Sequence, residues 1–349
     1  MKVAILGASM SHQSRRHDTG AVVGYSVVLE EEFSKRLGLA PGGLTRRTYP
    51  GNRLNDGGLI QLREVLRDRP DVCVIEPLVE DSSRGTWAKP YELRSVYHIL
   101  MRAGIVPVTF MVPLPAGTDP RRVPVTRTVR EICAEYDLPV HDVDIPALVA
   151  RGLTFAGHHT TADSAPAIGR ELGRFLEKLD IPALKARLAQ LDLPEPGIRM
   201  DRVPVPAFPS LFRLKLDIAP KGDAPFDLRV IQEQQVGPFS PMLSVTLRDA
   251  GGTVLAETPV SVWDPYCHFE RASCVTLFSS PAPLEGPVML DIARSEEDPA
   301  YDTCRREVDS WPGPAERLMK PAGAVHLVSS SGVAGRCLAY EIGWRPDRR

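Results

Sequence analysis

The chain has 349 residues, of which 43% are hydrophobic and 25% charged, and its formal net charge is -2. This near-neutral balance provides no basic surface for nucleic acid, so nucleic-acid binding is excluded as a main function. The length exceeds what a single hydrophobic core usually holds, which predicts two domains. The sequence has neither an export signal nor eighteen consecutive apolar residues, which predicts a cytoplasmic protein that does not cross a membrane.

The six cysteines are spread unevenly and include no C-x-x-C pair, so we predict reduced thiols rather than disulfides. They are Cys73, Cys133, Cys267, Cys274, Cys304 and Cys337. The Cys267-His268 step with Cys274 has the residue types of a metal site, but a second pair of ligands with zinc spacing is missing. We therefore predict no metal and no cofactor.

The first eleven residues contain the feature around which the rest of the chain is organised. Residues 3–6 form an uninterrupted apolar run that ends in Gly7, and two serines, Ser9 and Ser11, follow directly. Such a run predicts a fully buried strand. A serine just after it lies at the carboxyl edge of the sheet, where open α/β folds place their ligands and reacting groups.

The first part of the chain alternates between strand and helix patterns. Strands are predicted at residues 2–7, 45–49, 71–76, 105–112 and 138–143, and helices at 20–38, 58–67, 91–103, 121–136 and 161–179. Five strands alternating with five helices predict a three-layer α/β domain with a mainly parallel sheet.

The pattern changes after the proline-rich stretch 193–197. Short alternating runs follow, such as 212–216, 243–247 and 288–292, and they are separated by glycine, proline and aspartate turns. Asp249-Ala250-Gly251-Gly252 has the composition of a hairpin turn. We predict a β-sandwich of about eight strands, with the α/β domain over residues 1–195 and the sandwich over 205–349.

A serine hydroxyl becomes a nucleophile only with a base within hydrogen-bond reach and with donors that hold the oxyanion. The sequence offers His158 and His159 in a loop directly before the last helix of the α/β domain. A serine after the first strand and a histidine before the last helix, at opposite ends of one domain, form a more specific pattern than either alone.

In this arrangement the chain resembles the SGNH hydrolases, also called the GDSL esterase family, over about residues 1–180. Gly7-Ala8-Ser9-Met10-Ser11 is similar to the family's Gly-Asp-Ser-x-Ser block, which implies that Ser9 is the nucleophile. Residues 155–164 are similar to the final Asp-x-x-His block, with His159 as the base and His158 beside it. The resemblance implies a three-layer, flavodoxin-like fold.

The second and third blocks of the family supply the oxyanion donors around the serine and the histidine. Residues 52–58 fall where the second block lies, which implies a backbone oxyanion donor at Gly57 or Gly58. Residues 71–81 resemble the strand and loop that end in Gly-x-Asn-Asp, which places Glu80 and Asp81 at the site.

The chain departs from the family pattern at several of these positions. Ala8 replaces the aspartate beside the nucleophile, Leu78 replaces a glycine, and Glu80 stands where an asparagine donates to the oxyanion. A carboxylate at that place would repel the developing negative charge unless it is protonated or turned away.

The aspartate that orients the histidine is also absent, because Ala156 occupies its place. The triad is thereby reduced to a serine–histidine dyad unless another acid substitutes. Asp142, Asp144 and Asp163 are the candidates, together with a backbone carbonyl.

The resemblance implies a serine-dependent acyl ester hydrolase or acyltransferase that acts on O-acetyl groups of a carbohydrate or on a related small ester. Two alternatives stay open. The first is a binding or scaffold protein whose catalytic blocks have decayed, as Leu78, Glu80 and Ala156 indicate. The second is a dinucleotide-binding Rossmann domain, although its G-x-G-x-x-G fingerprint is missing, since only Gly7 precedes Gly20.

Overall fold

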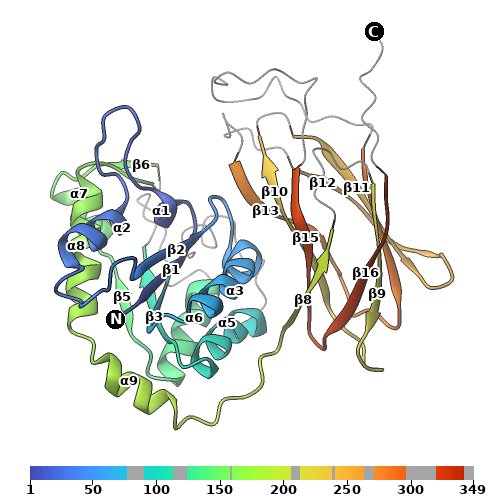
Figure 1. Cartoon of the computed structure of the whole chain (residues 1–349), viewed down its shortest axis with the longest axis horizontal. Helices are drawn as coiled ribbons and strands as arrows, with labels where there is room; N and C mark the ends of the chain where they lie inside the picture. The colour runs from blue at the N-terminus through green and yellow to red at the C-terminus, as the bar shows by residue number, and fades with distance from the viewer. Residues whose placement is uncertain are drawn as a thin grey trace. The chain divides into compact units, whose positions relative to one another are not determined.

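The computed structural model describes residues 1–76, 90–112, 124–157, 159–205, 213–237, 240–262, 271–295 and 320–341. The chain divides into two compact units, Met1–Gly197 and Ile198–Arg349 (Figure 1).

The first unit is built on a parallel sheet with the strand order β2-β1-β3-β4-β5. Its strands are β1 (Val3–Gly7), β2 (Leu44–Thr48), β3 (Val72–Ile75), β4 (Val106–Met111) and β5 (Val140–Asp142). The side chains of β3 and β4 are buried along their whole length, and so are the first four of β1, which is why these segments are continuous apolar runs. The chain reverses its direction across the sheet between β1 and β3. Ligand crevices of open α/β sheets form at such a switch point.

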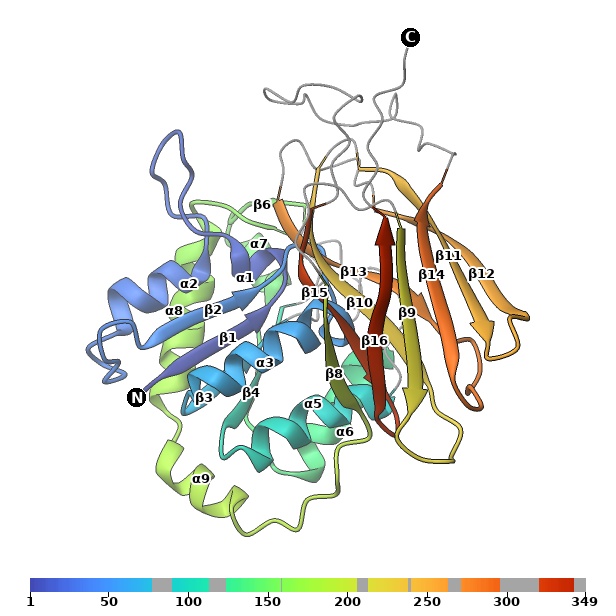
Figure 2. The same cartoon turned by 45° about the vertical axis from the view of Figure 1, so that its right-hand side comes forward.

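Helices cover both faces of this sheet (Figure 1 and Figure 2). They are α1 (Ser9–His12), α2 (Tyr25–Val28), η1 (Leu29–Phe33), η2 (Leu54–Gly58), α3 (Leu59–Asp68), α5 (Pro90–Arg102), α6 (Pro124–Glu135), α7 (Ile145–Ala150), α8 (Ser164–Glu177) and α9 (Ile181–Leu188), where η marks a π-helical turn. The α2 and α8 helices pack together on one face, whereas α3, α5 and α6 lie on the other. The predicted three-layer α/β domain is confirmed.

The predicted boundaries are wrong at two helices. The helix expected at 20–38 begins only at Tyr25, because Arg15 pairs with Val22 and Gly20 adopts a φ of 67°, so the preceding residues form a loop. The helix expected at 161–179 begins at Ser164, because the side chain of Asp163 accepts a hydrogen bond from the Ser164 amide and caps the helix there.

The second unit contains nine antiparallel strands in its described part. They are β8 (Arg199–Pro204), β9 (Arg213–Pro220), β10 (Leu228–Val236), β11 (Met242–Asp249), β12 (Val254–Ser261), β13 (Arg271–Ser279), β14 (Val288–Arg294), β15 (Lys320–Ser329) and β16 (Val333–Glu341). One sheet has the order β13-β10-β15-β8 and the other β12-β11-β14-β9-β16. Alternate residues of both sheets, such as Leu216, Val245, Val230 and Leu327, share one buried core. The predicted β-sandwich is therefore confirmed.

The predicted turn at residues 249–252 joins β11 to β12. Asp249 donates its amide to the Thr253 carbonyl, and its side chain accepts from the Thr253 amide at 2.8 Å. Gly252 has a φ of 88°, a backbone conformation that favours glycine.

None of the helices in the described part of the chain is long and apolar enough to cross a lipid bilayer. Four described cysteines, Cys73, Cys133, Cys274 and Cys337, are free thiols. No group of three histidine, cysteine or acidic side chains among the described residues is arranged to hold a metal ion. The Cys267-His268 step and Cys304 lie outside these residues.

Candidate active site

Ser9 is the first residue of α1 and follows directly on β1, so it lies at the carboxyl edge of the sheet beside the switch point. Its Oγ is buried and makes no hydrogen bond in the described structure. A buried hydroxyl without a partner costs about 1–3 kcal/mol, so such groups are rare unless they have a function. The hydroxyl of Ser9 is therefore available to exchange a proton with a base.

The second serine of the block, Ser11, is tied into the core. Its Oγ donates to Glu76 Oε2 and lies 2.5 Å from the hydroxyl of Tyr25. All three side chains are fully buried. Burial raises the pKa of Tyr25 well above its usual range, and the nearby Glu76 adds to this effect. Since the Ser11 hydrogen points to Glu76, the tyrosine hydroxyl donates to Ser11 Oγ.

This Tyr25–Ser11–Glu76 chain fixes α1, which carries Ser9, to the end of β3. A side chain at Gly7 would break it, because a Cβ there would lie 2.2 Å from Ser11 Oγ and 3.0 Å from Glu76 Oε2. The roles of Ser11 and Glu76 were not predicted from the sequence. The signal available in the sequence for such a role was Glu76, an acid that follows the buried strand β3 directly.

Gly57 and Gly58 lie in η2, which contacts both β1 and β2. The Gly57 amide donates to Asp56 Oδ1 at 2.5 Å, and the Gly58 amide donates to the Arg53 carbonyl at 3.0 Å. A Cβ on Gly57 would lie 2.6 Å from the side chain of Asn52, so only glycine fits there. Both amides already have acceptors, and an oxyanion would have to replace one of them.

Asp56 is the acceptor that holds this turn together. It also accepts from the Arg53 amide, and its carboxylate forms an ion pair with the Arg53 guanidinium at 3.1 Å. Burial raises the pKa of Asp56, and the positive charge of Arg53 opposes that shift.

His159 lies on a two-stranded hairpin that was not predicted from the sequence. Ala156 of β6 (Phe155–Ala156) pairs with His159 of β7 (His159–Thr160), and Gly157 turns the chain with a φ of 67°. The hairpin strand β7 contacts α1. The elements that carry Ser9 and His159 are thus brought together at one edge of the sheet. His158, Glu80 and Asp81 lie outside the described residues.

The three acids considered as substitutes for the missing aspartate all have other partners. Asp142 forms an ion pair with Arg130. Asp144 accepts a hydrogen bond from the Ala147 amide at 2.9 Å and caps α7. Asp142 is thus part of a surface ion pair, and Asp144 stabilises the N-terminus of α7.

Asp163 closes the base of the β6–β7 hairpin. It accepts hydrogen bonds from the Thr154 amide at 2.9 Å, from the hydroxyls of Thr154 and Thr161, and from the Ser164 amide at 3.0 Å. These donors, the Thr161 hydroxyl first, lower the pKa of Asp163 to about 2. The residue therefore holds the two ends of the hairpin together and caps α8.

Asp163→Ala is expected to lower the free energy of unfolding by about 1 kcal/mol at pH 7, because it removes a helix cap. The folded-state pKa lies below the unfolded value, so this stabilisation is complete above about pH 4 and is lost as the pH falls through about 2. Urea unfolding of both proteins at several pH values measures it. A difference that stays constant down to pH 2 would contradict the assignment.

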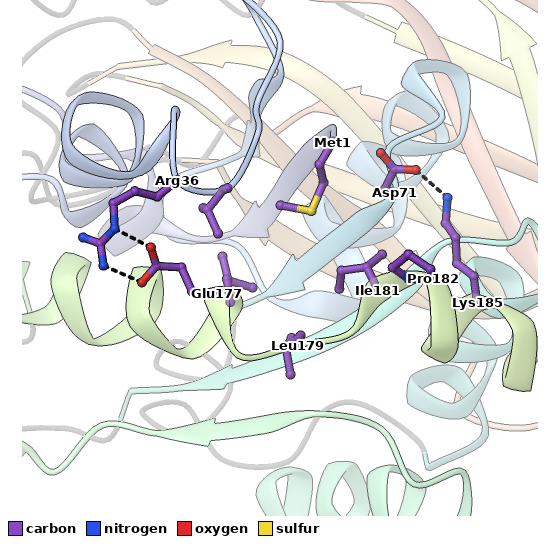
Figure 3. A pocket seen from close by; sticks show the side chains of 10 residues that line it. Met1, Arg36, Asp71, Glu177, Leu179, Ile181, Pro182 and Lys185 are labelled. Atoms are coloured by element: carbon purple, nitrogen blue, oxygen red, sulfur yellow. Dashed lines mark hydrogen bonds and ion pairs between the residues drawn. The ribbon is translucent and has the colours of Figure 1, made fainter.

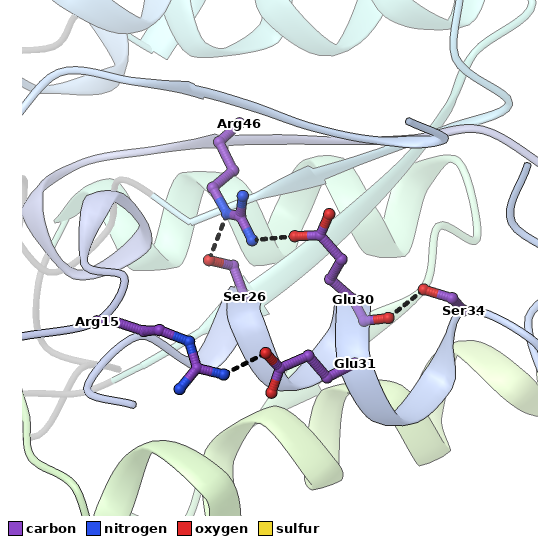
Figure 4. A network of polar contacts seen from close by, with 6 residues as sticks. All are labelled: Arg15, Ser26, Glu30, Glu31, Ser34 and Arg46. Atoms are coloured by element: carbon purple, nitrogen blue, oxygen red, sulfur yellow. Dashed lines mark hydrogen bonds and ion pairs between the residues drawn. The ribbon is translucent and has the colours of Figure 1, made fainter. Parts of the chain in front are cut away.

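Two arginines of the first unit, Arg15 after α1 and Arg46 in β2, are paired with acids (Figure 4). Arg15 forms an ion pair with Glu31, while Arg46 contacts Glu30 and the hydroxyl of Ser26, each at 2.8 Å. These contacts link the residues before and after α2 to one another. Both guanidinium groups are thus engaged by acids within the unit.

A separate hollow of about 480 Å³ lies at the opposite edge of the sheet (Figure 3). It is lined by Met1 and Asp71, which precede β1 and β3, and the Asp71–Lys185 and Arg36–Glu177 ion pairs border it at 2.5 Å each. Ser9 follows β1 at the other end of the strand. This hollow is therefore not part of the candidate active site.

The chain thus combines an α/β unit that carries a serine at the end of its first strand with a β-sandwich. No protein-family model matches the sequence, and the comparison with curated proteins gives no significant match. A solved two-domain esterase active on acetylated mannans is similar with a TM-score of 0.60 at 11% identity, over 93% of this chain and 90% of that chain.

A two-domain esterase of the same description, co-crystallised with mannopentaose, has a TM-score of 0.57 at 12% identity and the same coverage. At such identities the likeness shows the fold, and it spans nearly the whole chain. These neighbours are esterases, as the resemblance to the SGNH hydrolases predicts.

Proposed function

We propose that the protein is a serine-dependent carboxylic ester hydrolase that removes O-acetyl groups from a carbohydrate. The observation that carries this proposal is the buried, unpaired Oγ of Ser9 at the carboxyl edge of the sheet, next to the strand that bears His159. The fold likeness to an esterase that is active on acetylated mannans supports the substrate class. The cytoplasmic location expected from the sequence belongs to the same proposal.

The chemistry follows from the two side chains. His159 takes the proton of Ser9 as its Oγ attacks the ester carbonyl carbon, and the same proton then goes to the leaving sugar hydroxyl. The acetyl group stays on Ser9 as an ester. Water, deprotonated by His159, attacks this ester, releases acetate and restores the serine; a second hydroxyl in place of water would make the reaction an acyl transfer.

The oxyanion needs donors, and the amide of Ser9 with that of Gly57 or Gly58 is the proposed set. The Gly57 amide would have to leave Asp56, and the Gly58 amide would have to leave the Arg53 carbonyl. These two engaged amides, together with Ala156, are the observations that favour the alternative of a decayed, binding-only site.

The substrate class is tested by incubating the protein with acetylated mannan and measuring released acetate. We expect acetate from the acetylated polymer and none from the same polymer after chemical deacetylation. Release of p-nitrophenol from p-nitrophenyl acetate without any release from the polymer would support an esterase for another small ester. If neither substrate is hydrolysed and a fluorophosphonate does not label Ser9, the result would support the alternative of a decayed, binding-only site. An increase in the melting temperature on addition of NAD would support the alternative of a dinucleotide-binding domain.

A further inference from the structure

The residue that follows α1, Gln13, contacts the strand that carries His159. Its Nε2 donates to the Thr160 carbonyl at 3.2 Å, and its Oε1 accepts from the Thr160 amide at 3.1 Å and from the Thr160 hydroxyl at 2.7 Å. The amide side chain thus bonds both main-chain groups of Thr160, as a neighbouring strand would. We call this contact the Gln13–Thr160 clamp.

The clamp is anchored firmly at both ends. Thr160 is only 2% exposed, and its hydroxyl also lies 2.5 Å from the Val23 carbonyl, so it shares its hydrogen between two acceptors. At the other end, the main-chain amide of Gln13 donates to the main-chain carbonyl of Ser9 at 3.2 Å. A short path of hydrogen bonds therefore runs from the main chain of Ser9 to the residue next to His159.

The clamp restrains the backbone that carries the proposed base. The main chain of His159 is held through pairing with Ala156 on the other strand of the hairpin and through Gln13 at Thr160. Displacing a reacting group by about 1 Å can lower a rate about 10²-fold. A restraint on this backbone therefore bears directly on the reaction.

We propose that Gln13 is a positioning residue that sets the distance between Ser9 and His159. The inference rests on the proposed function, since it assigns Gln13 a role in that same reaction. Gln13 does not touch the reacting atoms in this account. It acts through Thr160 on one side and through α1 on the other.

The test compares kcat and KM for p-nitrophenyl acetate in Gln13→Ala and in the unaltered protein. We expect kcat to fall about 10- to 100-fold and KM to change less than about 2-fold, because the substrate contacts stay while the reacting groups move apart. The rate of Ser9 labelling by a fluorophosphonate should fall in parallel. Gln13→Glu keeps both hydrogen bonds that Oε1 accepts but turns the donor into a carboxylate oxygen that faces the Thr160 carbonyl, so its kcat should also fall.

Lys185→Ala is the matched control, since it removes the long-range contact with Asp71 at the opposite edge of the sheet and should leave kcat unchanged. Unchanged kcat in Gln13→Ala, with Ser9→Ala inactive, overturns the positioning role and leaves the proposed function intact. Turnover that persists in Ser9→Ala overturns both. If Gln13→Ala does not fold, Gln13→Glu decides the question. A kcat in Gln13→Glu that equals the kcat of the unaltered protein contradicts the proposal.

Discussion

Ser9→Ala is expected to lower kcat for p-nitrophenyl acetate by about 10⁴-fold or more, since the acyl-enzyme cannot form without the hydroxyl. His159→Ala should cost a similar factor, because His159 takes the serine proton in the proposed mechanism. The double variant should be no worse than either single one, since groups that act as a unit are lost together. Initial rates at saturating substrate measure all three.

Ser34→Ala is a suitable control for the serine substitution. Ser34 lies in the same unit, and its hydroxyl donates to the Glu30 carbonyl in the contacts around α2 and η1 (Figure 4). Its kcat should equal that of the unaltered protein. Equal turnover in Ser9→Ala and Ser34→Ala would remove Ser9 from the mechanism.

The second large effect is expected at Gly7. Gly7→Ala places a Cβ 2.2 Å from Ser11 Oγ and 2.5 Å from Ser11 Cβ, so α1 must shift away from β3. Overpacking of this kind costs about 1–3 kcal/mol of the free energy of unfolding. Because α1 carries Ser9, kcat should also fall, by about 10²-fold. Urea unfolding and ester hydrolysis measure the two effects.

Gly197→Ala tests whether the loss is specific. Gly197 belongs to the same unit, and an added Cβ would meet only ordinary contacts, the nearest being Ser95 Oγ at 3.4 Å. Its free energy of unfolding should stay within about 0.5 kcal/mol of the unaltered value. If Gly7→Ala is as stable and as active as Gly197→Ala, the close approach of Gly7 to Ser11 has no consequence.

The sequence predicts the helices and strands of the three layers well, because burial imposes a recognisable pattern of apolar residues on each element. The run at residues 3–6 and the strand at 72–75 are apolar throughout, since both faces of a parallel sheet are covered. The position of Ser9 follows from the same pattern, because a residue just after a buried parallel strand must lie at its carboxyl edge.

The elements that hold His159 could not be predicted from a pattern of apolar residues. Strands of two residues, such as β6 and β7, are too short to display a period, so residues 155–160 read as a loop. The partner of Gln13 lies 147 residues further along the chain, and no local pattern links the two. The acids that cap helices, Asp144 and Asp163, resemble candidate triad members in sequence because capping and catalysis both use carboxylates.

The Gln13–Thr160 clamp also has a consequence for how the molecule acquires its activity. It joins the first turn after β1 to the β6–β7 hairpin, 147 residues further along the chain, and the other four strands of the parallel sheet lie between them in sequence. Contacts of such long sequence separation form late, because the entropy of closing the loop has to be offset first. The appearance of ester hydrolysis during refolding would therefore follow the pairing of these two distant segments, and a chain that ends before Thr160 would remain inactive.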